Sequence, residues 1–266
     1  MKNKLYFSLF ALLLFALCFS CGQVNEDERL IEIESAQVNR AVLIEDFTGQ
    51  MCVNCPAATE EIHHLQQEFG EENVIAVGIY SGPFGVHPTT GRNLPLTTET
   101  GKTYFTHWNL SEQPIGLVNR HGKSNYPEWA AKIYDELAAT TPVSLRCNSF
   151  ESVADSLVMQ VSVHASQALS AKLQLWIIED SIVSTQYLPN DVIDRNYVHN
   201  HVFRAAVNGD WGTALTLSEG KTQSLRYSCL KDEAWQADNL SLVAFAYNDS
   251  GVLQVIKQHL NTSIEQ

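Results

Sequence analysis

The chain has 266 residues, with 30 acidic against 17 basic side chains and a formal net charge of −13 at pH 7. This balance argues against a nucleic-acid-binding protein, which needs a basic surface, and against electrostatic attachment to anionic lipid. After an N-terminal export segment is set aside, about 245 residues remain, enough for one large or two ordinary domains.

The N-terminus has the pattern of an export signal. Residues 1–4 contain two lysines, and the apolar run at 5–17 is shorter than the ~20 residues that cross a membrane as a helix. We therefore predict a signal peptide over residues 1–20.

The end of this segment predicts a lipid anchor. Residues 17–22, Leu-Cys-Phe-Ser-Cys-Gly, resemble the lipobox at which bacterial signal peptides are cut and the new terminal cysteine is acylated, although Cys18 stands where an aliphatic residue is usual. We expect lipid on Cys21, followed by an acidic tether over residues 21–40. Several acyl chains would hold the protein to a membrane without a transmembrane helix.

Residues 41–141 alternate between strand and helix patterns. The apolar runs at 41–47 and 73–80 have the length of buried strands, and between them Pro56 opens a helix that Gly70 ends. Such a unit implies parallel strands with a right-handed crossover. Further patterns predict a helix at 99–108, a strand at 113–119 and a helix at 127–139.

From residue 142 the apolar period changes to two, which is typical of strands with one buried face. The alternating sets are Val143/Leu145/Cys147, Leu157/Met159/Val161/Val163, Ala171/Leu173/Leu175/Ile177, Leu225/Tyr227/Cys229 and Leu240/Leu242/Ala244/Ala246. The sequence therefore predicts two domains, an α/β domain over residues 41–141 and an all-β antiparallel sandwich of immunoglobulin-like type over residues 142–266.

A CxxC motif, Cys52-Val53-Asn54-Cys55, lies between the first strand and the first helix. At a helix N-terminus, free N–H groups and the helix dipole stabilise a thiolate. We expect Cys52 to be the more exposed and more acidic thiol, and Cys55 to resolve the mixed disulfide.

The strand, motif and helix at residues 42–56 resemble the thioredoxin superfamily. The resemblance implies that Asp46, six residues before Cys52, is a general base, and that Pro114 is a cis-proline facing the motif. The chain departs from the superfamily at Met51, where tryptophan is usual, at the Val53-Asn54 dipeptide, and in the strand after residue 119, which is short or missing.

The motif by itself is compatible with a metal half-site, a structural disulfide or a redox pair. Zinc needs four ligands, but the sequence has no second CxxC, and at most one of His63 and His64 could turn toward the cysteines. We expect no metal or other cofactor.

Two further pairs could carry chemistry in the second domain. Cys147 and Cys229 both fall in the apolar phase of their strands, which predicts a disulfide in the sandwich core, although two buried free thiols would fit as well. His199 and His201 alternate onto one face of a predicted strand and are weak metal candidates, with a hydrogen-bonded polar stripe as the alternative.

The lipobox, residues 45–56 and residues 197–202 together resemble the Bacteroidetes family of twenty-eight-kilodalton outer-membrane proteins. The resemblance implies an outer-membrane lipoprotein and says little about a reaction.

Two functions are compatible with these patterns. The first is thiol–disulfide exchange on exported proteins, whose thiols or disulfides would be the partners, with the membrane bound through lipid and no nucleic acid bound. The second is a surface binding or adhesion lipoprotein in which the Cys52–Cys55 bond is structural.

Overall fold

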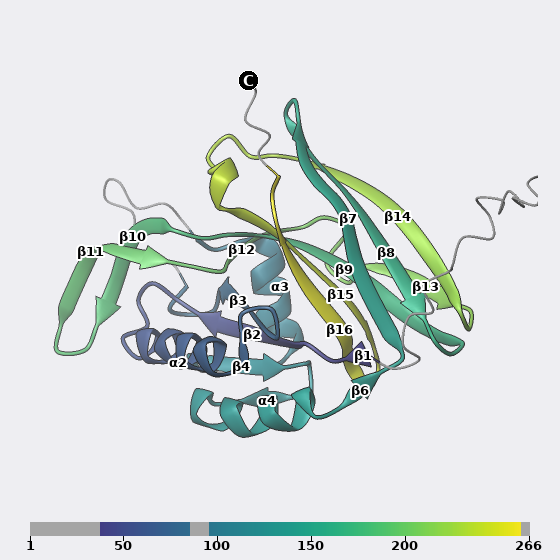
Figure 1. Ribbon diagram of the computed structural model, residues 1–266. Coiled ribbons are helices and arrows are strands. Elements are labelled where there is room, and N and C mark those ends of the chain that lie inside the picture. Colours follow the sequence, from purple (N-terminus) through teal and green to yellow (C-terminus); the bar gives the residue numbers. More distant parts are fainter. Residues whose placement is uncertain (1–37, 86–95, 262–266) are drawn as a thin grey trace, which may run out of the picture. The chain divides into compact units, whose positions relative to one another are not determined.

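The structure is a computed structural model that describes residues 38–85 and 96–261 (Figure 1). The predicted signal peptide, Cys21 and most of the tether lie outside the described residues. The described residues all belong to one compact unit. None of the described helices has the length and apolar character needed to cross a membrane.

The described elements up to residue 137 follow the predicted strand–helix alternation. They are β1 (Val38–Asn39), β2 (Val42–Thr48), α2 (Cys55–Phe69), β3 (Val74–Tyr80), α3 (Glu99–His107), β4 (Ile115–Val118), β5 (Lys123–Ser124), a 3-10 turn (Tyr126–Glu128) and α4 (Trp129–Leu137). The predicted helices and buried strands are confirmed, β2 and β3 are parallel, and Gly70 follows α2 with a φ of 93° that glycine adopts without strain. The strand after residue 119 is short, as expected, because β5 has two residues.

The remaining elements are strands, apart from one 3-10 turn at Ala237–Asn239. They are β6 (Thr140–Thr141), β7 (Val143–Val153), β8 (Ser156–Ala165), β9 (Leu169–Glu179), β10 (Ile182–Leu188), β11 (Val192–His199), β12 (Val202–Ala206), β13 (Thr213–Leu217), β14 (Lys221–Leu230), β15 (Leu240–Asn248) and β16 (Gly251–His259). The sequence analysis missed β10 and β13.

A mixed nine-stranded sheet runs through the described unit in the order β16-β15-β9-β12-β3-β2-β4-β5, with β13 beside β9 (Figure 1). The strand β12 joins β3 in parallel and β9 antiparallel, so strands from both sides of residue 141 belong to the same sheet. The domain boundary near residue 141 stays a prediction.

A second sheet, β14-β8-β7, packs against one face of the C-terminal strands of the large sheet. The apolar positions with period two that the sequence picked out in β8, β9 and β15 meet in this core. An α/β segment with a thioredoxin-like order of elements is therefore followed by β structure with sandwich-like layering. The immunoglobulin-like type stays a prediction.

The predicted Cys147–Cys229 disulfide is wrong, because both thiols are free. Cys147 lies on β7 and Cys229 on β14, and β8 separates these strands in the sheet. Both cysteines stand at the apolar positions of their strands, but this pattern does not place the two strands next to each other.

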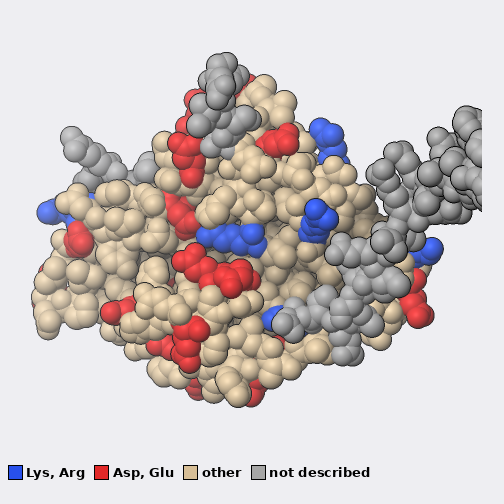
Figure 2. All heavy atoms as spheres, viewed as in Figure 1, with Lys and Arg blue, Asp and Glu red and all other residues tan. Residues whose placement is uncertain are grey.

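Acidic and basic side chains are interspersed on the face drawn in Figure 2, where Lys and Arg form no continuous patch. The net charge is negative, and the cationic side chains on this face are scattered. Nucleic-acid-binding proteins instead have their cationic side chains clustered in a basic patch.

The two faces of β2 meet different layers. Val42 and Ile44 pack with α2 and α4, whereas Leu43 and Phe47 pack with aromatic side chains of β9 and β15. Because side chains alternate along a strand, Glu45 lies on the aromatic side of the sheet.

Glu45 is fully buried there and forms an ion pair with Arg120, with 2.6 Å between Oε1 and Nε. The guanidinium of Arg120 also lies over the rings of Phe245 and Tyr247, with Cζ 4.8 and 4.4 Å from their centroids. Burial disfavours the charged form of Arg120, but the Glu45 carboxylate outweighs this effect and raises the pKa of the guanidinium.

We expect Glu45→Gln to lower the free energy of unfolding by about 3–5 kcal/mol, because the change leaves the Arg120 charge buried without a counter-ion. Urea unfolding at pH 8 measures the effect. The control is Glu99→Gln in the exposed Glu99–Lys102 pair, where we expect a loss below about 1 kcal/mol. Equal losses in the two variants would contradict a structural role for the buried pair.

Candidate functional site

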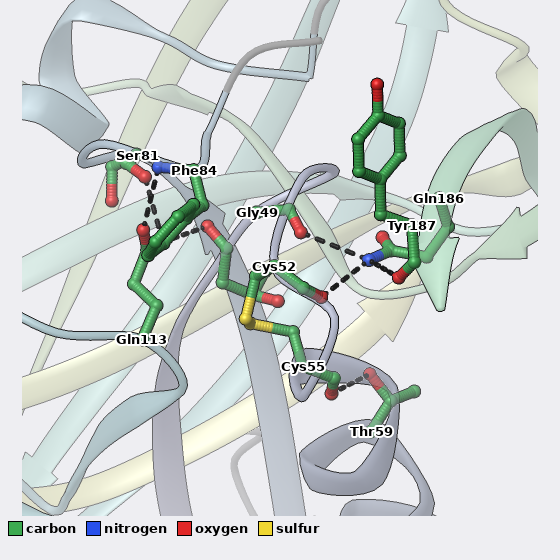
Figure 3. Close-up of a disulfide and its surroundings, with 10 residues drawn as sticks. Gly49, Cys52, Cys55, Thr59, Ser81, Phe84, Gln113, Gln186 and Tyr187 are labelled. Carbon is green, nitrogen blue, oxygen red and sulfur yellow. Dashed lines mark hydrogen bonds between the residues drawn. A yellow bond between two sulfur atoms is a disulfide. The ribbon is translucent and has the colours of Figure 1, made fainter. Parts of the chain in front are cut away.

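The predicted motif forms a disulfide at the start of α2 (Figure 3). Cys55 is the first residue of the helix, Pro56 follows it, and the Cα atoms of Cys52 and Cys55 are 5.4 Å apart. The residue before the helix, Asn54, makes no capping hydrogen bond with its side chain. The first N–H groups of the helix are therefore not satisfied by that side chain, an arrangement that favours negative charge at the motif.

Both cysteines are buried, and Cys52 is the more exposed of the two by a small margin, in the expected order. The exposed fractions are 4% for Cys52 and 1% for Cys55. Little of either residue is therefore open to a thiol on another protein.

The β10–β11 hairpin contacts the loop that contains the disulfide from one side. The side-chain amide of Gln186 on β10 donates hydrogen bonds to the carbonyl oxygens of Cys52, at 2.9 Å, and Gly49, at 3.2 Å (Figure 3). The next residue, Tyr187, donates its backbone N–H to the carbonyl oxygen of Gln50 at 2.8 Å. These contacts bind the hairpin to the loop that carries the disulfide.

A second set of contacts holds the same loop from the turn after β3. The backbone N–H of Met51 donates to the carbonyl oxygen of Phe84 at 3.0 Å, and the Phe84 N–H donates to Oε1 of Gln113 at 3.2 Å. A Cβ atom at Gly49 would lie 2.2 Å from the Phe84 oxygen, so this close approach requires glycine. The Gln113–Pro114 peptide bond is cis, as the resemblance implied.

Asp46 lies on the helix-facing side of β2 and is 2% exposed. Its Oδ1 atom has no hydrogen-bond partner among the described residues, and burial raises the pKa of the carboxyl to about 7. The charge of Asp46 contributes to the raised pKa values of Tyr80 and Tyr197, whose main cause is burial. A carboxyl with this pKa can both take and return a proton near neutral pH.

The expectation that His199 and His201 share one strand face is wrong. The strand β11 ends at His199, and His201 has a φ of 57° in the turn before β12. The His199 ring contacts the Tyr80 hydroxyl at 2.7 Å, and burial lowers the pKa of this imidazole to about 4. The His201 ring lies 3.2 Å from the Asp180 carboxylate. Among residues 38–85 and 96–261, no group of three or more possible metal ligands is found.

Sequence reasoning missed Gln186 and Tyr187, which hydrogen-bond to the loop that contains the disulfide. The segment around them has no clear apolar period, since polar residues such as Ser184 and Gln186 are buried and Val183 is exposed. Glu45 was missed as well, although a second carboxylate beside Asp46 in a buried strand signals the need for a partner.

We expect Asp46→Asn to stabilise the protein at pH 8 and to change its stability little at pH 4. The carboxyl has an ordinary pKa of 3.8 and a folded-state pKa of about 7, so the folded state binds the proton more tightly and loses stability as the pH rises between these values. The full difference corresponds to about 4 kcal/mol. Urea unfolding at pH 4, 6 and 8 measures it, with the exposed Asp191→Asn as control. A constant difference at all three pH values would refute the raised pKa.

Comparison with known proteins agrees with the fold. The solved structure of HBP35 of Porphyromonas gingivalis matches 87% of this chain and 80% of its own, with 15% identity and a TM-score of 0.66. Protein AGR_C_4864 from Agrobacterium tumefaciens matches 87% of this chain and 100% of its own, with 14% identity and a TM-score of 0.52. At these identities the likeness concerns the fold alone. No curated protein sequence matches the chain.

The family model described as "Outer membrane protein Omp28" matches residues 101–264, which is more than half of the chain. The matched range contains Pro114 and Gln186 but not Cys52 or Cys55. The resemblance predicted from the sequence is thereby confirmed, and the chain belongs to the Omp28 family of outer membrane proteins.

Proposed function

We propose that this outer membrane lipoprotein carries out thiol–disulfide exchange on exported proteins through Cys52 and Cys55. The observation that supports this function best is the position of a CxxC disulfide at the first turn of α2, following a strand that carries a buried carboxyl with a pKa of about 7. The lipid on Cys21 and the protein clients belong to the same proposal.

The exchange proceeds in two steps that balance. A client thiolate attacks one sulfur of the Cys52–Cys55 disulfide, which forms a mixed disulfide with Cys52 and releases Cys55 as a thiolate that takes a proton from Asp46. A second client thiolate then attacks the client sulfur of the mixed disulfide and releases Cys52. The client gains a disulfide, and its two electrons remain on the Cys52–Cys55 dithiol. The reverse sequence reduces a client disulfide.

We infer that the contacts of Gln186 and Tyr187, which hold the loop that contains Cys52, loosen before a client reaches its sulfur. The burial of both cysteines supports a second candidate function, in which the protein binds a ligand or surface and the disulfide is a permanent cross-link of the thioredoxin-like segment.

The reduction potential separates the two candidates. We expect a value between about −270 and −120 mV for a pair that exchanges, and below about −300 mV for a structural cross-link. The measurement is a redox titration of the purified full chain in glutathione or dithiothreitol buffers, with Cys52→Ser as the control that removes the couple. A potential below the exchange range would refute the proposed reaction and leave the binding function.

A second prediction concerns the hydrogen bonds that Gln186 donates to the disulfide loop. Gln186→Ala should speed reduction of the disulfide by dithiothreitol by about tenfold, because opening no longer breaks the hydrogen bonds from Gln186 to the Cys52 and Gly49 carbonyls. The control is Gln223→Ala on β14, which removes a side-chain hydrogen bond to the Thr216 carbonyl at the other sheet. An unchanged rate in Gln186→Ala, with the fold intact, would mean that the hairpin does not limit access.

A further inference from the structure

A cavity of about 450 Å³ opens on the aromatic side of the large sheet, in the size range of small-molecule sites. Its walls come from the end of α3, the turn after β4, β9, the turn before β13 and the β15–β16 turn. The lining residues are His107, Trp108, Arg120, Lys172, Trp211, Tyr247, Asn248, Asp249 and Gly251. None of them takes part in the contacts around the Cys52–Cys55 disulfide.

Hydrogen-bond donors without acceptors distinguish this cavity. Arg120 is 8% exposed, and its Nε atom donates to Glu45. Its Nη1 and Nη2 atoms interact with the Tyr247 side chain but have no acceptor in good hydrogen-bond geometry among the described residues. The indole Nε1 atom of Trp108 is also buried without a partner there. Buried donors of this kind destabilise a protein unless an acceptor reaches them.

Arg120 is held in place by the turn that carries it. Arg120 has a φ of 62° and Asn119 a φ of 46°, both in the left-handed region that few non-glycine residues adopt. The Asn119 side chain accepts a hydrogen bond from the Leu43 N–H at 2.9 Å, and the Asn119 carbonyl accepts one from the Val252 N–H at 2.9 Å. Contacts to two strands thus stabilise the unusual backbone and fix the direction of the arginine.

The walls around these donors are aromatic. The Tyr247 ring lies 4.4 Å from Cζ of Arg120, and the Trp211 ring lies 4.2 Å from the ring of His107. Lys172 is exposed at the cavity and places its Nζ atom 5.9 Å from the centre of the Tyr247 ring. Asp249 is the acidic residue of the lining and is exposed.

We propose that this cavity binds a small organic carboxylate with a flat apolar body. The Nη1 and Nη2 groups of Arg120 match the two oxygens of one carboxylate, a paired geometry that neutral groups do not satisfy as well. Both atoms are buried, so a ligand reaches them when the neighbouring aromatic side chains shift. Lys172 adds a second cation, and Trp108, Trp211 and Tyr247 contact the apolar body. This site is separate from the proposed exchange reaction and does not depend on it.

The test is isothermal titration of the purified full chain with 1-naphthylacetate. The amide 1-naphthylacetamide keeps the ring and removes the charge, and acetate keeps the charge and removes the ring. We expect naphthylacetate to bind about tenfold tighter than either comparison ligand. The indole N–H resonances of Trp108 and Trp211 should shift on binding. Equal affinity for the acid and the amide, or no heat above a protein-free blank at millimolar ligand, overturns the proposal.

Variants of the lining residues test whether naphthylacetate binds in this cavity. Lys172→Ala and Trp211→Leu should each weaken naphthylacetate binding about tenfold, and Arg120→Lys should do so while keeping a cation beside Glu45. The matched control is Lys221→Ala, an exposed lysine on β14 that does not line the cavity. If Arg120→Lys fails to fold, the Lys172 and Trp211 variants decide the result. Affinity that is the same in these two variants as in Lys221→Ala overturns the assignment.

Discussion

The buried ion pair between Glu45 and Arg120 is the interaction on which much of this structure depends. It joins β2, the strand before the CxxC motif, to the turn after β4 and to the aromatic side chains of β9 and β15. Neighbouring positions of β2 thus have opposite environments. Glu45 has a cation at 2.6 Å on one face of the sheet, whereas burial raises the pKa of Asp46 to about 7 on the other. Burial raises the pKa of both carboxyls, but for Glu45 the charge and hydrogen bond of Arg120 oppose this effect, so the surroundings and not the residue type distinguish the two groups.

The β10–β11 hairpin lies in the chain between β9 and β12, which are neighbouring strands of the large sheet. The parallel pair β3 and β12 aligns Gly78, near the end of β3, with Val202 at the start of β12. The hairpin precedes β12 in the chain, and Gln186 and Tyr187 hydrogen-bond to the loop that follows β2 and contains the CxxC motif. Insertion of β10 and β11 at this point brings Gln186 to the loop that contains the disulfide. The topology that extends the thioredoxin-like segment with further strands thus also adds contacts to its CxxC loop.

Family membership and the candidate chemistry concern different parts of the chain. The family match at residues 101–264 contains the lining residues of the aromatic cavity and the β10–β11 hairpin, but Cys52, Cys55 and Asp46 precede it. The membership establishes an outer membrane protein. The exchange reaction rests on the geometry of residues 46–55, and the carboxylate site rests on unpaired donors inside the matched range.

The sequence by itself determined the elements whose signals are local. The apolar runs and the Pro56 and Gly70 boundaries predicted β2, α2 and β3, and the period-two sets predicted the strands whose buried faces form the second core. Relations between distant segments required the tertiary structure. The apolar phase of Cys147 and Cys229 was read correctly, but only strand order shows that β8 separates them. The partner of Glu45 is 75 positions away, and the glutamine that hydrogen-bonds to the Cys52 carbonyl is 134 positions away. Periodicity records which face of an element is buried, whereas the contacts of that face depend on how the strands pair, which no local pattern encodes.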